Sequence, residues 1–239
     1  MGDMIKFAGI GLGLAAVGAI ILVAIIAGVL VLAYLGYIPF LSDLMGTAKS
    51  KDLGVQFSPA DYASGLAKIP GHIVKNAEDL CFGCAYISKG SVPVDNTFTQ
   101  SEFTAQINKF NEKKGPIKNA QVKFNGDGSI EASAMTSLPQ LNAPVYAKAF
   151  IESVSPRSLK IRLDSAKIGP LELVGDNLKQ AEDAANSAIQ AFIDQNPGLQ
   201  IESLEIQDGK VKFKGNFPEE IEGDPNSLPP DFNIPGFGG

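Results

Sequence analysis

The sequence predicts an α+β fold, in which one N-terminal transmembrane helix precedes a single domain of antiparallel β-sheet packed on a long amphipathic helix. Three observations lead to this fold class. Phe7 to Ser42 is a run of thirty-six residues without Asp, Glu, Lys or Arg. Between Val122 and Leu163, apolar residues recur with the period of two that is typical of strands. Between Asn177 and Gln195 they recur with the period of a helix.

The charge-free run predicts a membrane anchor over residues 1–41. A helix needs about 20 apolar residues to cross a hydrocarbon core of about 30 Å, and the stretch from Phe7 to Tyr34 is longer than that. Tyr37 stands where an interfacial aromatic belt would lie, and Pro39 can end the helix. A cleaved signal peptide is the competing interpretation, but its apolar region would be only about 7–15 residues long.

The charges that flank the run do not fix its orientation, because Lys6 on one side is set against Lys49 and Lys51 on the other. The body of the chain is far larger than the six-residue N-terminus. We therefore expect a single-pass protein of the cell membrane, with a short cytoplasmic N-terminus and an extracytoplasmic body. The remaining segments expected are a juxtamembrane linker at 42–54, the α+β domain at 55–222 and a disordered Gly/Pro-rich tail at 223–239.

The composition argues against a nucleic-acid partner. The chain has 20 Lys and Arg against 26 Asp and Glu, a net charge of −6, so it offers no basic surface of the kind that nucleic acids require. The lipid bilayer is the partner that the anchor predicts.

Cys81 and Cys84 are the two cysteines, in the sequence Cys-Phe-Gly-Cys. In an extracytoplasmic domain the simplest interpretation is a structural disulfide. A redox pair, a zinc site completed by His72, and two unpaired thiols remain open, since a lone C-x-x-C is weak evidence for any of them.

Two helices are expected in the first half of the domain. Ser58 and Pro59 form a helix start, and that helix should run to about Lys68. Thr99, followed three residues later by Glu102, is a capping box that opens the second helix.

Strands follow from period-two alternation and from turn residues. The expected elements are a hairpin around Asn125–Gly128, strands at Val145–Ile151 and Leu159–Leu163, a short strand at Leu171–Leu173, the long helix Asn177–Gln195, and a last hairpin around Gln207–Gly209.

No catalytic constellation is evident. His72 is the only imidazole, and no nucleophile motif accompanies it. We therefore expect no enzymatic activity, no metal and no cofactor. Gly9 and Gly13 form a G-x-x-x-G face, which would let the anchor approach a membrane-protein partner or a second copy of the chain closely.

The capping box at Thr99, the Asn125–Gly128 turn, the alanine-rich helix and the closing Ile206–Gly215 hairpin resemble the YpmS-like family of membrane-anchored extracytoplasmic proteins and, more distantly, the tubular lipid-binding domains. The resemblance covers roughly residues 95–220, and it leaves out Val55–Ser91. It implies a strongly curved antiparallel sheet wrapped around the long helix, with room for an apolar groove that would hold a lipid chain.

Three functions are consistent with the sequence. The first is a membrane-tethered, non-enzymatic domain that binds a lipid or other apolar ligand at the membrane surface. The second is an accessory or scaffold subunit of a membrane complex, and the third is a thiol–disulfide protein that uses Cys81 and Cys84. For the first, the candidate groove residues, which could equally fill a solid core, are Phe150, Ile161, Leu163, Ile189 and Phe192.

Overall fold

The computed structural model describes residues 49–70, 72–75, 86–112, 117–136 and 143–223. The predicted anchor at 1–41 and nearly all of the predicted tail lie outside these residues. The helices described are α3 (Pro59–Ala67), α4 (Gln100–Asn111) and α5 (Asp176–Gln195). The strands are β1 (His72–Lys75), β2 (Tyr86–Lys89), β3 (Val92–Thr99), β4 (Ile117–Phe124), β5 (Ser129–Thr136), β6 (Pro144–Ser155), β7 (Ser158–Ile168), β8 (Leu171–Leu173), β9 (Gln200–Gln207), β10 (Lys210–Phe217) and β11 (Glu220–Gly223).

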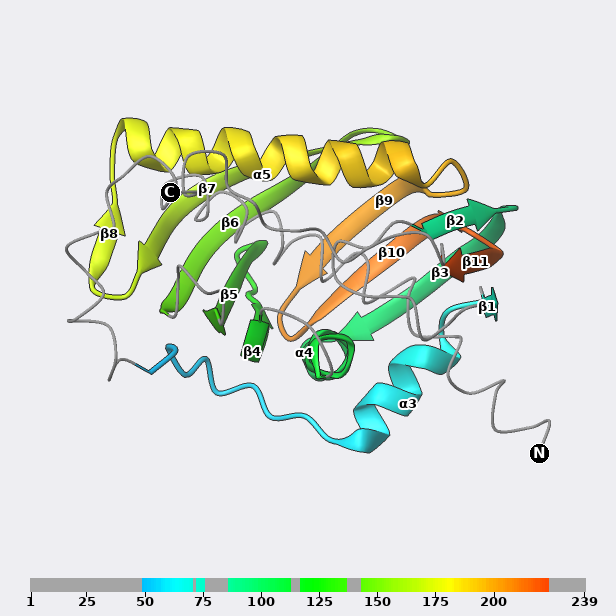
Figure 1. Ribbon diagram of the computed structural model, residues 1–239, viewed down its shortest axis with the longest axis horizontal. Coiled ribbons are helices and arrows are strands. Elements are labelled where there is room, and N and C mark those ends of the chain that lie inside the picture. The colour runs from blue at the N-terminus through cyan, green and yellow to red at the C-terminus, as the bar shows by residue number, and fades with distance from the viewer. Residues whose placement is uncertain (1–48, 71, 76–85, 113–116, 137–142, 224–239) are drawn as a thin grey trace, which may run out of the picture.

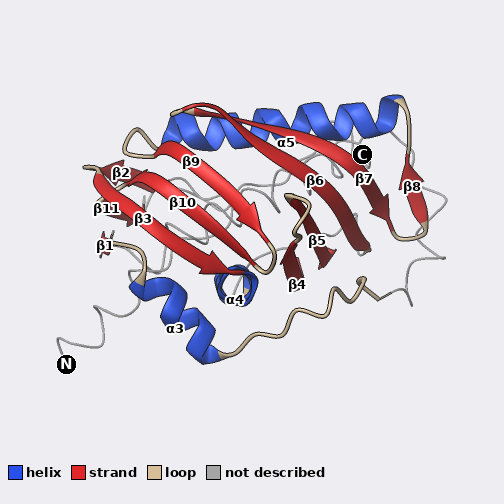
Figure 2. Cartoon of the chain, turned by 180° about the vertical axis from the view of Figure 1, so that it is seen from behind, coloured by secondary structure: helices blue, strands red, loops and turns tan. Residues whose placement is uncertain are grey.

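The strands form three sheets. The largest has the order β4-β5-β6-β7-β8, and the other two have the orders β3-β10-β9 and β1-β11-β2. All the pairings are antiparallel except β1 with β11. Figures 1 and 2 show α5 running along one side of the two larger sheets, with α4 between those sheets on the opposite side.

The five-stranded sheet has one apolar and one polar face. On β6, Val145, Ala147, Ala149 and Ile151 are buried, and we call their side of the sheet the inner face. The intervening residues lie on the outer face. The inner face shares one core with α4, β10 and α5, through side chains that include Phe103, Ile107, Val211, Phe213, Ala185 and Ile189.

Local signals begin the first two helices as expected. The Ser58 side chain accepts a hydrogen bond from the Asp61 amide, and the Thr99 side chain accepts one from the Glu102 amide. Glu102 also joins α4 to α3, because Lys68 Nζ lies 2.7 Å from its carboxylate. The helix α3 is therefore held against α4.

The long helix is found as α5, within one residue of its expected start, and it lies along the open edge of β7. Asn186 accepts a hydrogen bond from Ile161 N at 2.8 Å and donates one to Ile161 O at 2.9 Å. Glu182 accepts another from Leu163 N at 2.9 Å. These side chains form hydrogen bonds with backbone groups of β7 that would otherwise pair with a neighbouring strand.

The far end of α5 is fixed by Arg157, in the turn between β6 and β7. Its guanidinium donates to the carbonyls of Ile193, Asn196, Pro197 and Leu199 at 2.6–3.1 Å. These are carbonyls at and just beyond the helix end, where the last turn lacks partners within the helix. In the next strand, Ile201 N donates to Pro156 O, which links β9 to the same turn.

The predicted fold class is wrong. The sequence predicted one curved sheet wrapped around a long helix together with a transmembrane helix, whereas the described residues form three separate sheets. None of the described helices has both the length and the apolar character needed to cross a membrane. The sheet does not continue around α5 because β8 pairs only with the end of β7, at Ala166–Ile168, and side chains of α5 rather than another strand bond the β7 backbone at Ile161 and Leu163.

We expect Asn186→Ala to lower the free energy of unfolding by at least about 2 kcal/mol. It leaves the N–H and C=O of Ile161, a fully buried residue, without partners, at about 1–3 kcal/mol per buried group. The neighbouring Ser187→Ala, on the exposed side of α5, should change stability by no more than about 0.5 kcal/mol. Urea unfolding of the full chain in a non-ionic detergent measures both variants. Equal effects of the two changes would contradict the role given to Asn186.

Candidate ligand-binding site

Residues 49–57 lie across the outer face of the five-stranded sheet, and we call this segment the strap. Gln121 on β4 accepts hydrogen bonds from Leu53 N at 2.8 Å and Val55 N at 3.4 Å, and its amide nitrogen donates to Asp52. Leu53 and Val55 are buried. Residues 49–54, which the sequence assigned to a linker, are therefore bound to the folded domain.

Glu131 on β5 connects the strap to β6. Its carboxylate accepts hydrogen bonds from Lys51 Nζ at 3.0 Å, Tyr146 OH at 2.8 Å and Asn125 Nδ2 at 3.2 Å. Lys51 Nζ also lies 3.8 Å from the centre of the Tyr146 ring, within the range of a cation–π contact. One carboxylate thus fixes both the lysine of the strap and the tyrosine below it.

The pKa shifts of these three groups agree with a stable ion pair. For Glu131, burial is the largest influence and acts to raise the pKa, but the hydrogen bonds from Lys51 and Tyr146 outweigh it and lower the pKa. For Lys51, burial acts to lower the pKa, but the interactions with Glu131 and Tyr146 outweigh it and raise the pKa. Burial and the bond to Glu131 raise the pKa of Tyr146. At neutral pH the cluster is therefore an ammonium, a carboxylate and a neutral phenol.

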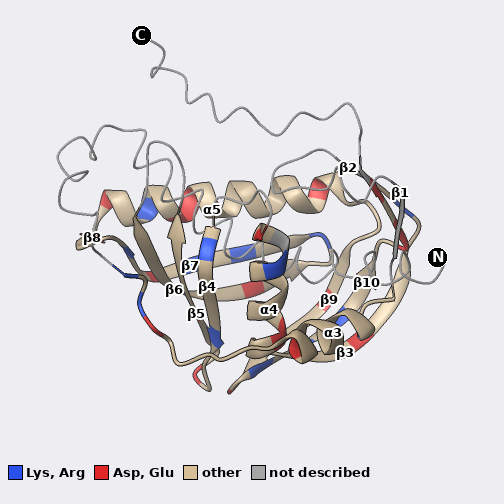
Figure 3. Ribbon diagram, turned by 60° about the horizontal axis from the view of Figure 1, so that its bottom comes forward, with Lys and Arg blue, Asp and Glu red and all other residues tan. Residues whose placement is uncertain are grey.

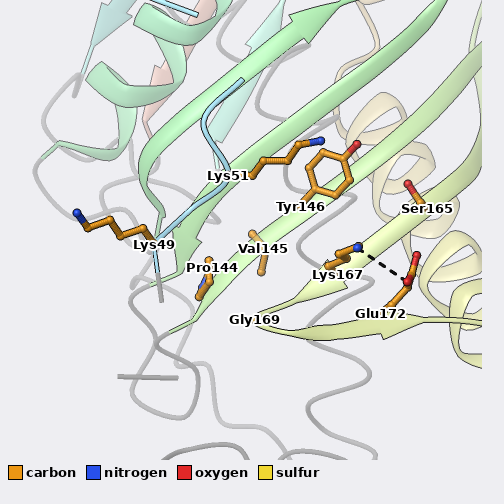
Figure 4. Close-up of a pocket in the computed structure, with 9 residues that line it drawn as sticks. All are labelled: Lys49, Lys51, Pro144, Val145, Tyr146, Ser165, Lys167, Gly169 and Glu172. Atoms are coloured by element: carbon orange, nitrogen blue, oxygen red, sulfur yellow. Dashed lines mark ion pairs between the residues drawn. The ribbon is translucent and has the colours of Figure 1, made fainter. Parts of the chain in front are cut away.

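A pocket of about 380 Å³ lies between the start of the strap and the outer face of β6, β7 and β8. It is lined by Lys49, Lys51, Pro144, Val145, Tyr146, Ser165, Lys167, Gly169 and Glu172. Figure 4 shows Lys51 extended beside the Tyr146 ring and Lys167 facing Glu172, with the Lys49 side chain at the rim, turned away from Lys167.

The lining of the pocket is basic, although its surroundings are mixed. Three lysines and a single carboxylate, Glu172, line it. Lys167 Nζ lies 3.8 Å from Glu172, beyond hydrogen-bond distance, and the two side chains are 46% and 55% exposed. Figure 3 shows basic and acidic residues interspersed over the strap and the nearby strands.

The structure brings four of the five predicted groove residues together, but as parts of the core. Ile161, Leu163 and Ile189 are 0%, 6% and 1% exposed, and Phe192 is partly buried against them. Phe150 lies on the other side of the sheet, where the Arg162 guanidinium sits 4.4 Å from its ring centre. Phe150 faces outward because successive side chains of a strand point to opposite faces, and the next residue, Ile151, faces inward.

Sequence reasoning missed every residue that lines the pocket. Lys49 and Lys51 were considered only as charges flanking the anchor. Tyr146 could have been assigned to the polar face, because it alternates with the buried Val145 and Ala147. Tyr146 lies near Lys51 and Lys167 because distant parts of the chain pair with one another, and no local pattern indicates those pairings.

The other candidate residues are not placed in this pocket. Cys81, Cys84, Gly9 and Gly13 lie outside the described residues. His72 begins β1 and pairs in register with Glu220. Within the described part of the chain, no three His, Cys, Asp or Glu residues come together as a metal site would require.

No protein-family model, curated protein or solved structure matches the chain. The resemblance to the YpmS-like family therefore stays a prediction, and the function has to be inferred from the geometry described above.

We expect Glu131→Gln to loosen the strap and to lower stability by about 1 kcal/mol, because it removes a charge-assisted hydrogen bond from a partly exposed site. The Leu53 and Val55 amides should then exchange with deuterium faster than in the wild type. Glu152→Gln, at an exposed position on β6, is the matched control and should leave both amides unchanged.

The same variant gives a pH dependence of defined sign. Because the folded-state pKa of Glu131 is lowered from its ordinary value of 4.5, its contribution is fully present above about pH 4.5 and is lost as the pH falls through the lowered pKa. The stability difference between wild type and Glu131→Gln should therefore shrink only below about pH 4.5. A difference that grew as the pH fell would contradict this assignment.

Proposed function

We propose that this chain is a membrane-tethered, non-enzymatic module whose extracytoplasmic domain binds a lipid at the membrane surface. The polar end of the lipid would be held in the pocket beneath the strap. One observation carries the proposal: the pocket is built partly from Lys49 and Lys51, which follow the predicted anchor closely in sequence. The segment that would tether the domain is therefore also a wall of its binding site.

The distance from the predicted anchor supports this arrangement. Seven residues lie between the end of the anchor at 41 and Lys49, and the eight steps from 41 to 49 span at most about 28 Å, at about 3.5 Å per residue in a fully extended chain. A tether of that length keeps the pocket within reach of lipid headgroups. It also raises the effective concentration of membrane lipid at the site.

The chemistry of the pocket suits an amphipathic molecule better than the core does. Ammonium groups and the Ser165 hydroxyl lie beside Pro144 and the ring of Tyr146, so polar and apolar parts of a ligand would both find contacts. The candidate groove residues Ile161 and Ile189, by contrast, are already covered by the protein's own side chains. This favours the outer pocket over an interior groove.

The two alternative functions depend on residues outside those described. An accessory subunit would use Gly9 and Gly13, and a thiol–disulfide protein would use Cys81 and Cys84. Both remain predictions from the sequence.

Lipid retention provides the test. The full chain, purified in a mild detergent and extracted with organic solvent, should release a bound lipid that mass spectrometry detects. Ser165→Trp should abolish retention because the indole fills the pocket, whereas Ser187→Trp, on the exposed side of α5, should retain as much lipid as the wild type. A wild type without lipid, or equal retention by the two variants, would contradict the proposal.

A further inference from the structure

The pocket holds an ammonium group in a fixed position before any ligand arrives, and Glu131 balances its charge. Lys51 is immobilised by its hydrogen bond to Glu131 and its contact with the Tyr146 ring. An ammonium has three donors. Glu131 takes one of the donors on Lys51 and the ammonium lies over the Tyr146 ring, so donor capacity is left for a ligand. Because the side chain is already ordered, a ligand bound there costs little further side-chain entropy.

Lys167 brings a second ammonium to the same tyrosine. It is the register partner of Tyr146 across the β6–β7 pair, so both side chains stand on the outer face. Ser165, two residues earlier on β7, points to that face as well, and its hydroxyl can donate a hydrogen bond. Two lysine side chains and a serine side chain, from the strap and β7, therefore line the same pocket as Tyr146.

Glu172 is positioned as a weak counter-ion. Its separation of 3.8 Å from Lys167 and the exposure of both side chains indicate an ion pair worth about 0–1 kcal/mol. A ligand with more negative charge could displace Glu172 from Lys167 at little cost. Lys49, at the rim, adds to the local positive potential without holding any fixed contact among the described residues.

From this geometry we propose that the pocket binds a phosphate group, with Lys51, Lys167 and Ser165 as its donors and Glu172 as the counter-ion that the phosphate replaces. This inference rests on the proposed function and names the chemical class of its ligand. Donors from two separate segments suit a tetrahedral group with acceptors on several sides, and lysines bind phosphate as point charges. A carboxylate would be better matched by the planar fork of an arginine, and no arginine is among the lining residues.

The test uses the full chain in an uncharged detergent, titrated separately with inorganic phosphate, short-chain phosphatidylglycerol and a monoacylglycerol that lacks phosphate. We expect saturable binding of the phosphate compounds and none of the monoacylglycerol. Phosphatidylglycerol binding at least about tenfold tighter than inorganic phosphate identifies a lipid headgroup as the source, and the reverse order identifies free phosphate.

Three variants sharpen the test. Lys167→Gln should weaken phosphate binding about tenfold, the loss expected for one charge-assisted hydrogen bond. Glu172→Gln should strengthen binding severalfold, because the competing carboxylate is gone. Lys160→Gln makes the same charge change on the same strand and outside the pocket, and should have no effect.

The outcomes separate this inference from the proposed function. The inference is overturned if no phosphate compound binds, if Lys160→Gln weakens binding as much as Lys167→Gln, or if the monoacylglycerol binds as well as phosphatidylglycerol. In that last case the module still binds lipid and the proposed function stands. Saturable binding of inorganic phosphate by a chain that retains no lipid would support the inference and contradict the proposed function.

Discussion

The rest of the structure depends on which groups form hydrogen bonds with the backbone N–H and C=O groups along the open edge of β7. Buried backbone groups must find hydrogen-bond partners, and an uncovered strand edge invites pairing with another chain. Here Asn186 and Glu182 of α5 supply those partners, and Arg157 fixes the end of the same helix. Because a helix occupies the part of this edge that β8 does not cover, no longer strand pairs with β7 there. The inner face of the five-stranded sheet is then filled by α4, α5 and β10, which leaves the outer face for contacts with the strap.

The function that we propose follows from this division of the sheet. The inner face is a packed core, in which Ile161 and Ile189 contact protein rather than ligand. The outer face carries Glu131, which fixes Lys51 and Tyr146 together. The strap is held on that face by Gln121, so a tether arriving from the membrane would enter the domain at the pocket itself. The contacts that hold the strap on the sheet would then both attach the tether to the domain and shape the ligand pocket.

Much of the secondary structure could be predicted from the sequence because its signals are local. The capping boxes at Ser58 and Thr99, the Asn125–Gly128 turn and the apolar stripe of α5 each depend on residues a few positions apart. The sheet β1-β11-β2 was missed because its strands are short and β1 pairs in parallel with a distant segment. The fold class was wrong because no local pattern indicates that Asn186 replaces a strand. The pocket was missed for the same reason, since the strap and β7 are far apart in the chain.

Photocrosslinking in membranes tests most directly whether the pocket meets lipid at the bilayer surface. A photoreactive benzophenone side chain would replace Glu172 at the pocket, or Ser187 on the exposed side of α5, in the full chain in its membrane. Mass spectrometry of the irradiated protein would then identify any adduct. Our proposal predicts a phosphate-bearing lipid attached at position 172 and none at position 187. Adducts of equal yield at both positions, or no adduct at 172, would contradict the account.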